Sequence, residues 1–234
     1  IDSSGTYEHE IISELEFFFK HQEIALLVGG SGMYINAVLK GLDNLPKNLR
    51  IREDLNKKFK KKGIAVLQNE LKKLDLAHYK NMDSQNPQRI IRAIEVCLIT
   101  GRPYSSFLSN TSKKRSFSNL KFLLFLEKEI LYNNINSRVD NMIKDGLIEE
   151  VETLKESNNL NALKTVGYKE IFDYLNGEID KKSAIEKIKI NTKKYSKRQM
   201  TWFKKDPSYQ WIDNTNIEKS KKSILKKIKE FKYD

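Results

Sequence analysis

A short apolar run, IALLV at residues 24–28, leads directly into Gly29-Gly30 and constrains the fold of this chain more than any other feature. An unbroken apolar run of strand length that ends in a glycine turn is typical of a buried parallel strand. Apolar residues at helical spacing over 6–20 precede this run, and Ser31-Gly32 opens another helix that extends to about residue 39. The order of helix, strand, glycine turn and helix predicts an α/β core built on a parallel sheet.

The rest of the chain adds further strands and helices. The apolar run at 121–126 predicts a second strand, and Trp211-Ile212 predicts a last short one. Asn86 as the cap and Pro87 in the first turn predict a helix that ends at Gly101. Residues 105–119 are rich in Ser, Asn and Lys and are expected to form a loop. Apolar periodicity predicts further helices at 130–144, 147–157, 167–175 and 181–204, and a basic amphipathic one around 224–231.

Residues 46–83 differ from their surroundings because they are highly charged and contain no strand-like run. Two short helices are expected there, at about 50–61 and 64–74, with Gly63 between them. We therefore predict a small helical insertion at 46–83, with the α/β core formed by 1–45 and by 84–234, which also carries the C-terminal basic helices.

The composition describes a globular chain of 39% hydrophobic and 32% charged residues. No apolar run has the length of a membrane span, and no secretory leader is recognised. The single cysteine, Cys97, excludes an internal disulfide, lies on an apolar helix where burial is expected, and fits the cytoplasm. His9, His21 and His78 lack metal-ligand spacing, so no metal site made of protein ligands alone is expected.

The net charge of +12 points to a polyanionic partner if the charge is concentrated, and to a solvated surface if it is spread evenly. Between Ser183 and Lys205, Glu186 is the only acidic residue against eight Lys or Arg. Tyr and Trp side chains alternate with these charges, as in sites for single-stranded RNA. This stretch is the strongest indication of nucleic-acid binding, although we expect Trp202 to belong to the core.

Two other patterns leave their role open. The turn from Gly29 to Gly32 can bring backbone N–H groups close to an anion or a base edge, but such turns are also common structural features. It is not a Walker phosphate loop, because no Gly-Lys-Ser/Thr follows. Arg138 can pair with Asp140 or bind a pyrophosphate with two donors, and its spacing decides neither.

The helix that begins at Asn86 has a polar face formed by Gln88, Arg92 and Glu95. These side chains can contact base edges or phosphates. On spacing alone, the simpler interpretation is favoured, in which the face is solvated and Arg92 pairs with Glu95.

Taken together, five segments in a fixed order resemble the tRNA dimethylallyltransferase family, also called isopentenyltransferases, over essentially the whole chain. They are LLVGGSGMYINAVLKGL at 26–42, the segment 51–104 with NPQRIIRAIE at 86–95, SRVDNMIKDGLIEEV at 137–151, KTVGYKEIFDYLNGEI at 164–179 and NTKKYSKRQMTWFKKD at 191–206. The resemblance implies a P-loop-NTPase-like α/β core with a helical insertion and tRNA held between the two.

It also implies a reaction. The N6 amine of the adenosine on the 3′ side of the anticodon, in tRNAs that read codons beginning with U, attacks dimethylallyl diphosphate. Pyrophosphate leaves with the help of Mg²⁺ bound to the substrate. A poor nucleophile such as this amine must be oriented, and the departing charge must be stabilised. The expected partners are the tRNA anticodon stem-loop and dimethylallyl diphosphate, bound by a monomer.

The resemblance carries site residues by position. Arg138 matches an arginine near the catalytic centre and is expected to hold the diphosphate. Lys169 and Lys204 stand where the family often has Arg, which keeps the charge but loses the two-pronged donor. The expected tRNA-binding residues are Ser31, Arg52, Gln88, Arg89, Arg92, Lys164, Gly167, Tyr168, Lys169, Lys197, Arg198, Gln199, Thr201, Trp202 and Lys204.

Two family features have no match in these 234 residues: the N-terminal glycine-rich phosphate loop and the aspartate that acts as general base. Both are expected before Ile1, so we predict that this polypeptide alone does not catalyse the transfer. The alternatives are a non-catalytic tRNA-binding remnant of such an enzyme and a generic basic RNA-binding protein.

Overall fold

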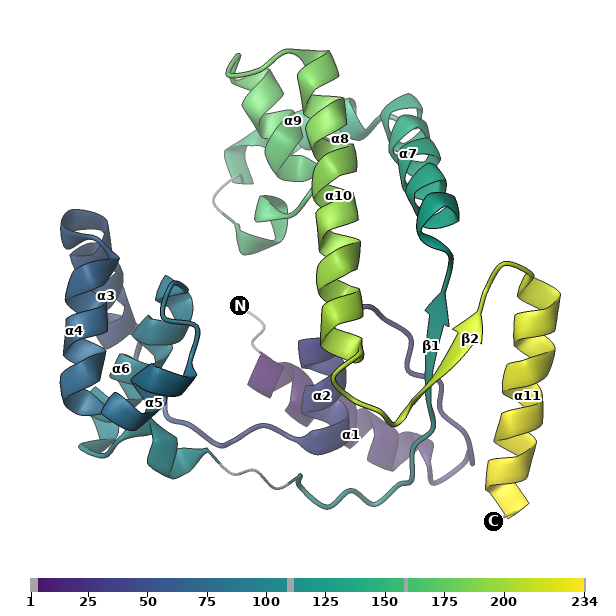
Figure 1. The fold of residues 1–234 in the computed structure, drawn as a ribbon, viewed down its shortest axis with the longest axis horizontal. Helices are drawn as coiled ribbons and strands as arrows, with labels where there is room; N and C mark the ends of the chain where they lie inside the picture. Colours follow the sequence, from purple (N-terminus) through teal and green to yellow (C-terminus); the bar gives the residue numbers. More distant parts are fainter. Residues whose placement is uncertain (1–3, 109–111, 158–159, 234) are drawn as a thin grey trace. The chain divides into compact units, whose positions relative to one another are not determined.

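The computed structural model describes residues 4–108, 112–157 and 160–233. It divides into two compact units (Figure 1). The first unit consists of residues 1–27 and 33–117, and the second of residues 28–32 and 118–234. The glycine turn therefore belongs to the second unit, although the helix that follows it lies in the first.

The first unit is helical. Its elements are α1 (Ser4–Phe18), α2 (Gly32–Lys40), α3 (Leu49–Lys62), α4 (Ile64–Leu74), α5 (Leu76–Asn81), α6 (Pro87–Thr100) and the 3₁₀ turn η1 (Tyr104–Phe107). Asn86 caps α6 by accepting hydrogen bonds from the backbone N–H groups of Gln88 and Arg89, as its sequence position predicts. Gly101, with φ of +67°, ends the same helix in the left-handed conformation that favours glycine.

The main core of the first unit lies where α3, α4 and α6 meet. Leu67 and Leu71 of α4 and Ile90 and Ile94 of α6 are fully buried there. The predicted helical insertion at 46–83 thus shares its core with α6, which the sequence assigns to the next segment. Cys97, also on α6, is buried as expected.

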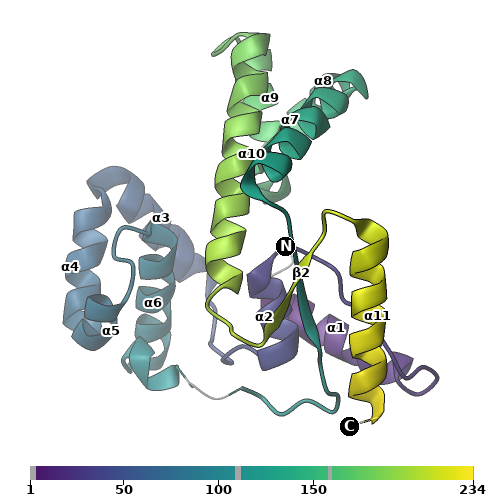
Figure 2. The ribbon, with the colours of Figure 1, turned by 45° about the vertical axis from the view of Figure 1, so that its right-hand side comes forward.

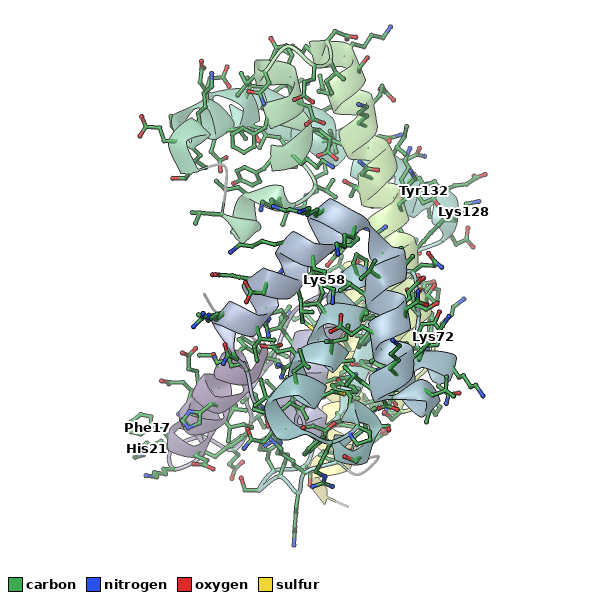
Figure 3. The ribbon with its side chains drawn as sticks, turned by 90° about the vertical axis from the view of Figure 1, so that its left-hand side faces the viewer. Phe17, His21, Lys58, Lys72, Lys128 and Tyr132 are labelled. Atoms are coloured by element: carbon green, nitrogen blue, oxygen red, sulfur yellow. The ribbon has the colours of Figure 1, made fainter. Side chains whose placement is uncertain are left out.

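A second cluster in this unit is polar. Glu8 of α1 is buried and accepts hydrogen bonds from the backbone N–H of Leu42 at 2.9 Å, from Lys113 at 2.9 Å and from Arg115 at 2.8 Å. Arg115 also donates to the carbonyl of Ala37. One carboxylate therefore ties α1 to the end of α2 and to the segment that follows η1. At the far end of α1, the rings of Phe17 and His21 lie edge to face (Figure 3).

The second unit contains a parallel pair of strands, β1 (Lys121–Phe125) and β2 (Tyr209–Asp213), in which Lys121 stands opposite Tyr209. In the sequence, the two strands are separated by α7 (Lys128–Lys144), α8 (Leu147–Thr153), η2 (Lys155–Ser157), η3 (Asn161–Lys164), α9 (Tyr168–Leu175) and α10 (Lys181–Phe203). The last helix, α11 (Ile217–Tyr233), follows β2 and lies beside it (Figure 2).

The helices of this unit have their own apolar core. Val139, Val151, Ile171 and Ile188, which come from α7, α8, α9 and α10, are buried together. Figures 1 and 2 show α7, α8 and α9 gathered around the N-terminal part of α10. The C-terminal part of α10 is thereby left to contact other segments of the unit.

The strands predicted at 121–126 and near Trp211 are confirmed as β1 and β2, but the strand predicted at 24–28 is wrong. Among the described residues no strand pairs with that segment, and Leu26 and Val28 are 84% and 81% exposed. A strand is defined by its ladder, and apolar composition alone supplies no hydrogen-bonding neighbour. The short helix α5 was not predicted, although Asp75 directly before it caps the helix by accepting a hydrogen bond from the backbone N–H of His78.

Candidate nucleic-acid interface

The glycine turn and the C-terminal part of α10 contact each other closely, although they lie far apart in the sequence. Gln199 donates a hydrogen bond from Nε2 to the carbonyl oxygen of Gly30 at 2.8 Å. A Cβ atom at Gly30 would lie 2.2 Å from that same nitrogen, and one at Gly32 would lie 2.1 Å from Nε1 of Trp202. At Gly29, by contrast, a Cβ atom would meet nothing within 4 Å.

These distances explain the glycine at position 32. None of the three turn glycines has a positive φ, so backbone conformation does not require glycine there. Gly32 is instead favoured because the rigid Trp202 ring occupies the space where a Cβ atom would stand, whereas the atom closest to a Cβ at Gly30 is the end of the flexible Gln199 side chain, which can shift. Residues 29–32 and 197–204, which we call the turn–helix site, therefore form one surface.

The turn–helix site contains seven of the predicted tRNA-binding residues, and among those on α10, Gln199 and Trp202 are the two that contact the turn in the described structure. Ser31 is exposed between the two glycines that contact α10. Trp202 is 41% exposed, so the expectation that it belongs to the core is wrong. The helix turns its Phe203 side chain inward instead, against Tyr209 of β2. Besides Ser31 and Trp202, the site contains Lys197, Arg198, Gln199, Thr201 and Lys204.

Positive charges in this unit lie next to aromatic rings. Lys204 Nζ lies 5.9 Å from the centre of the Trp211 ring, and the Arg198 guanidinium 5.6 Å from that of Tyr195. On α7, Lys128 lies over the ring of Tyr132, which also faces Lys193 of α10 (Figure 3). Lys204, Arg198 and Lys193 form no ion pair with any described carboxylate. Their charge is thus available to a phosphate.

The segment 164–169 is held in shape by a residue that the sequence reading missed. Glu170, which is buried, accepts a hydrogen bond from the backbone N–H of Gly167 at 2.8 Å and another from Asn191 of α10 at 2.7 Å. Gly167 has φ of +104°, which a residue with a side chain rarely adopts. The carboxylate therefore fixes a strained turn against α10, and an acid three residues after a glycine at a helix start was the available signal.

The other predicted residues of this segment are exposed or partly exposed. Lys164 and Lys169 are exposed. The phenol of Tyr168 donates a hydrogen bond to the Glu150 carboxylate. The pKa of Tyr168 is raised, mainly by that hydrogen bond and to a smaller extent by burial and by the negative charge of Glu150.

On α7, the two possibilities for Arg138 are now separated. Asp140 pairs with Lys189 of α10, with the carboxylate oxygen 2.7 Å from Nζ, and Arg138 does not join that pair. Arg138 is exposed and makes no ion pair with any described residue. The hydrogen bond with Asp140, against a smaller effect of burial, raises the pKa of Lys189. Arg138 is therefore free to bind an anion.

The remaining predicted residues lie in the first unit. Gln88 and Arg89 are exposed in the first turn of α6. The Arg92–Glu95 pair expected from spacing is present at 2.8 Å, and Arg52 of α3 joins it at 2.7 Å from the same carboxylate oxygen. The expectation that this face is solvated is wrong for Glu95, which is buried where α3 packs against α6. The predicted site thus falls into two groups, one in each unit.

The described residues bring together no group of three His, Cys, Asp or Glu side chains that could hold a metal ion. No helix among them has the length and apolar character needed to cross a membrane.

Comparison with known proteins gives a consistent result. A family model described as IPP transferase matches residues 3–206. A tRNA dimethylallyltransferase of Christiangramia forsetii is 46% identical over 212 residues, which cover 90% of this chain and 70% of that protein. The tRNA dimethylallyltransferase 1 of Bacteroides fragilis is 46% identical over 211 residues, with the same coverage of 90% and 70%.

Solved structures agree in fold. The full-length tRNA isopentenylpyrophosphate transferase of Bacillus halodurans superposes with a TM-score of 0.65 at 28% identity, covering 97% of this chain and 72% of that one. A eukaryotic dimethylallyltransferase acting on tRNA gives a TM-score of 0.73 at 22% identity, covering 93% and 58%. With the parallel β1–β2 pair, these likenesses confirm the predicted P-loop-NTPase-like α/β fold class.

Proposed function

Because this chain belongs to the IPP transferase family, we propose that it serves as a tRNA dimethylallyltransferase. The reaction moves a dimethylallyl group from dimethylallyl diphosphate to N6 of the adenosine on the 3′ side of the anticodon. The proposal rests on the family and on one observation in particular, the turn–helix site, in which a glycine turn and a cationic helix form one surface.

The proposed transfer reaction needs a residue that holds the departing diphosphate. N6 forms a bond to the first carbon of the allyl group, the carbon–oxygen bond to the diphosphate breaks, and N6 passes a proton to a general base, a role for which these 234 residues have no match to the family's aspartate. The departing diphosphate carries the developing charge, and a guanidinium can hold two of its oxygens at once. Arg138, exposed and without an ion pair among the described residues, is the proposed diphosphate ligand.

Mg²⁺ is proposed as part of the substrate. When bound, the ion neutralises charge on the diphosphate. Diphosphate oxygens and water would supply most of its ligands.

The tRNA is proposed to contact the turn–helix site and the 164–169 segment. An anticodon loop is single-stranded, so its bases can be splayed out and stacked on aromatic side chains. Trp202, 41% exposed beside the turn, offers such a ring, and Lys197 and Arg198 offer charge for the backbone. Lys164 and Lys169 add exposed positive charge in the same unit.

The test measures binding and turnover separately. Binding of a fluorescent anticodon stem-loop is followed by anisotropy, and transfer by incorporation of a labelled dimethylallyl group. We expect Lys197→Glu to weaken binding at least tenfold. The control Lys222→Glu makes the same charge change on exposed α11, outside the family match, and should have little effect. Equal weakening by both variants would mean generic binding by a basic protein.

The diphosphate role has its own test. Arg138→Gln should raise the Kd for pyrophosphate about tenfold and leave stem-loop affinity within twofold, since a lost charge-assisted hydrogen bond is worth roughly 1.5–3 kcal/mol. An unchanged pyrophosphate Kd would remove Arg138 from the site. Because the phosphate loop and the general-base aspartate have no match in these 234 residues, stem-loop binding without turnover is the expected result for this polypeptide alone, and robust turnover would refute that prediction.

A further inference from the structure

Three segments of the first unit meet at one buried carboxylate. Glu95 of α6 is 0% exposed. Its Oε1 accepts a hydrogen bond from the backbone N–H of Asn48 at 2.8 Å. Its Oε2 accepts hydrogen bonds from Arg52 Nη2 at 2.7 Å and from Arg92 Nη1 at 2.8 Å, with Arg52 Nε at 3.3 Å.

The two arginines are not equivalent. Arg92 also donates to the backbone carbonyls of Pro46 at 2.8 Å and Leu45 at 3.1 Å, so its guanidinium holds the segment that leads into α3. Arg52 hydrogen-bonds through its guanidinium to Glu95 alone among the described residues, and its Nη1 makes no hydrogen bond with them. Its side chain is 37% exposed, against 30% for Arg92. Arg52 is thus the arginine with donors to spare.

The charges of the cluster do not cancel. Two guanidiniums share one carboxylate, so a net positive charge remains at a partly exposed position. Burial alone raises the pKa of Glu95, but the hydrogen bonds from Arg52, the Asn48 backbone and Arg92 outweigh it, and the pKa lies below its ordinary value of 4.5. The carboxylate is therefore ionised at neutral pH and keeps two like charges close together.

Stability alone does not explain such an arrangement. A buried ion cluster is often no more stabilising than apolar residues of the same volume, because desolvation offsets the attraction. What the cluster does provide is a fixed direction for a guanidinium, whose planar fork binds a phosphate with two parallel hydrogen bonds.

We propose that Glu95 is a positioning residue that aims Arg52 at a backbone phosphate of the bound RNA, with Arg92 bracing the same carboxylate from the other side. This inference rests on the proposed tRNA substrate and deepens it. It assigns to Arg92 a supporting role and to Arg52 the phosphate contact. Glu95, although negatively charged, strengthens the binding of a polyanion.

A positioning role and a simple net-charge effect predict opposite changes in stem-loop affinity when the charge of Glu95 is removed. Glu95→Gln removes one negative charge, and if only net charge mattered, the variant would bind the anticodon stem-loop as tightly as the wild-type chain or more so. If Glu95 positions Arg52, the Kd rises about tenfold. Glu53→Gln is the matched control, since it makes the same charge change one residue from Arg52, at an exposed position on α3.

Two more variants guard against misfolding and locate the contact. Glu95→Asp keeps the charge but shortens the side chain, and it should also weaken binding several-fold. Arg52→Gln should lower the slope of log K against log salt concentration by roughly 0.7–0.9, which corresponds to one phosphate contact. In the Arg52→Gln background, Glu95→Gln should cost no further affinity. Circular dichroism and thermal unfolding establish which variants fold.

The outcomes separate this inference from the proposed function. If the wild-type chain fails to bind the stem-loop, the proposed function fails. If the wild-type chain binds, and folded Glu95→Gln or Glu95→Asp binds as tightly as Glu53→Gln, then the positioning role is overturned while the proposed function stands. The same holds if Arg52→Gln leaves the salt slope unchanged.

Discussion

The contact between Gly32 and Trp202 leads to a prediction about stability that can be worked out in both directions. Gly32 opens α2 without a positive φ, so Gly32→Ala is compatible with the backbone. The added methyl group, however, would lie 2.1 Å from Nε1 and 2.2 Å from Cδ1 of the Trp202 indole. The substitution therefore combines a favourable backbone effect with a steric clash.

The two effects have different sizes. Replacing a helical glycine by alanine stabilises a protein by roughly 0.5–1 kcal/mol. Overpacking against a rigid ring costs about 1–3 kcal/mol, and Trp202 can relieve part of it because it is partly exposed. We expect Gly32→Ala to lower the free energy of unfolding by about 1 kcal/mol. In a Trp202→Ala background the clash is absent, and the same substitution should raise that free energy by up to about 1 kcal/mol.

The chain offers a direct assay and a matched control. Its two tryptophans, Trp202 and Trp211, both belong to the second unit, so tryptophan fluorescence during urea unfolding reports on that unit. In the double variant, Trp211 still provides the signal. Gly29→Ala is the control, because a Cβ atom there meets nothing within 4 Å and should not destabilise.

The decisive result is that Gly32→Ala lowers the free energy of unfolding in the wild-type chain but raises it in the Trp202→Ala background. A coupling free energy of about 2 kcal/mol between positions 32 and 202 lies within the range found for residues in contact. If Gly32→Ala has the same effect with and without the indole, or if Gly29→Ala costs as much, the glycine turn is not packed against α10. The account of the turn–helix site would then be wrong.

Three other predictions concern buried and paired side chains. Glu170→Ala should destabilise the second unit by about 1–3 kcal/mol in urea unfolding, because it leaves the Gly167 backbone N–H and the Asn191 amide without their acceptor; no change would show that the carboxylate is dispensable. Tyr168→Phe, which removes a surface hydrogen bond to Glu150, should change the unfolding free energy by less than about 1 kcal/mol, and a larger loss would contradict the exposed geometry. The pKa values of Glu8 and Glu95 lie below the ordinary 4.5, so their stabilisation is complete above that pH and is lost as the pH falls through their folded-state values. The thermal midpoint should accordingly fall from pH 6 to pH 3, less steeply in Glu95→Gln, and a parallel fall in that variant would refute the assignment.

Sequence reasoning succeeded where local chemistry decides the structure. Gly63, with φ of +73°, separates α3 from α4, and the predicted range 64–74 agrees with the observed Ile64–Leu74. Asn86 and Gly101 likewise bound α6 as predicted. Caps and left-handed glycines act within a few residues, so the sequence contains the whole interaction.

Sequence-based prediction failed where a segment far away in the sequence determines the local structure. The apolar run at 24–28 predicts a strand, but a ladder needs a neighbour that the run itself does not specify. Helical spacing placed Trp202 on a face of α10, yet it could not say that a glycine turn, rather than a core, lies against that face. The Arg92–Glu95 pair was foreseen from its spacing on one helix, whereas Arg52, from another helix, was not connected to it.

The parallel pairing of β1 with β2 has a consequence for how the second unit folds. In the sequence, β1 precedes α7, α8, α9 and α10, and β2 follows them. Pairing the two strands therefore closes a long loop. Loop closure costs less entropy once the intervening chain is already compact. The helical cluster should therefore assemble early and the strands should pair late. During refolding, the backbone N–H groups of the β1–β2 ladder should be the last in this unit to become protected from hydrogen exchange.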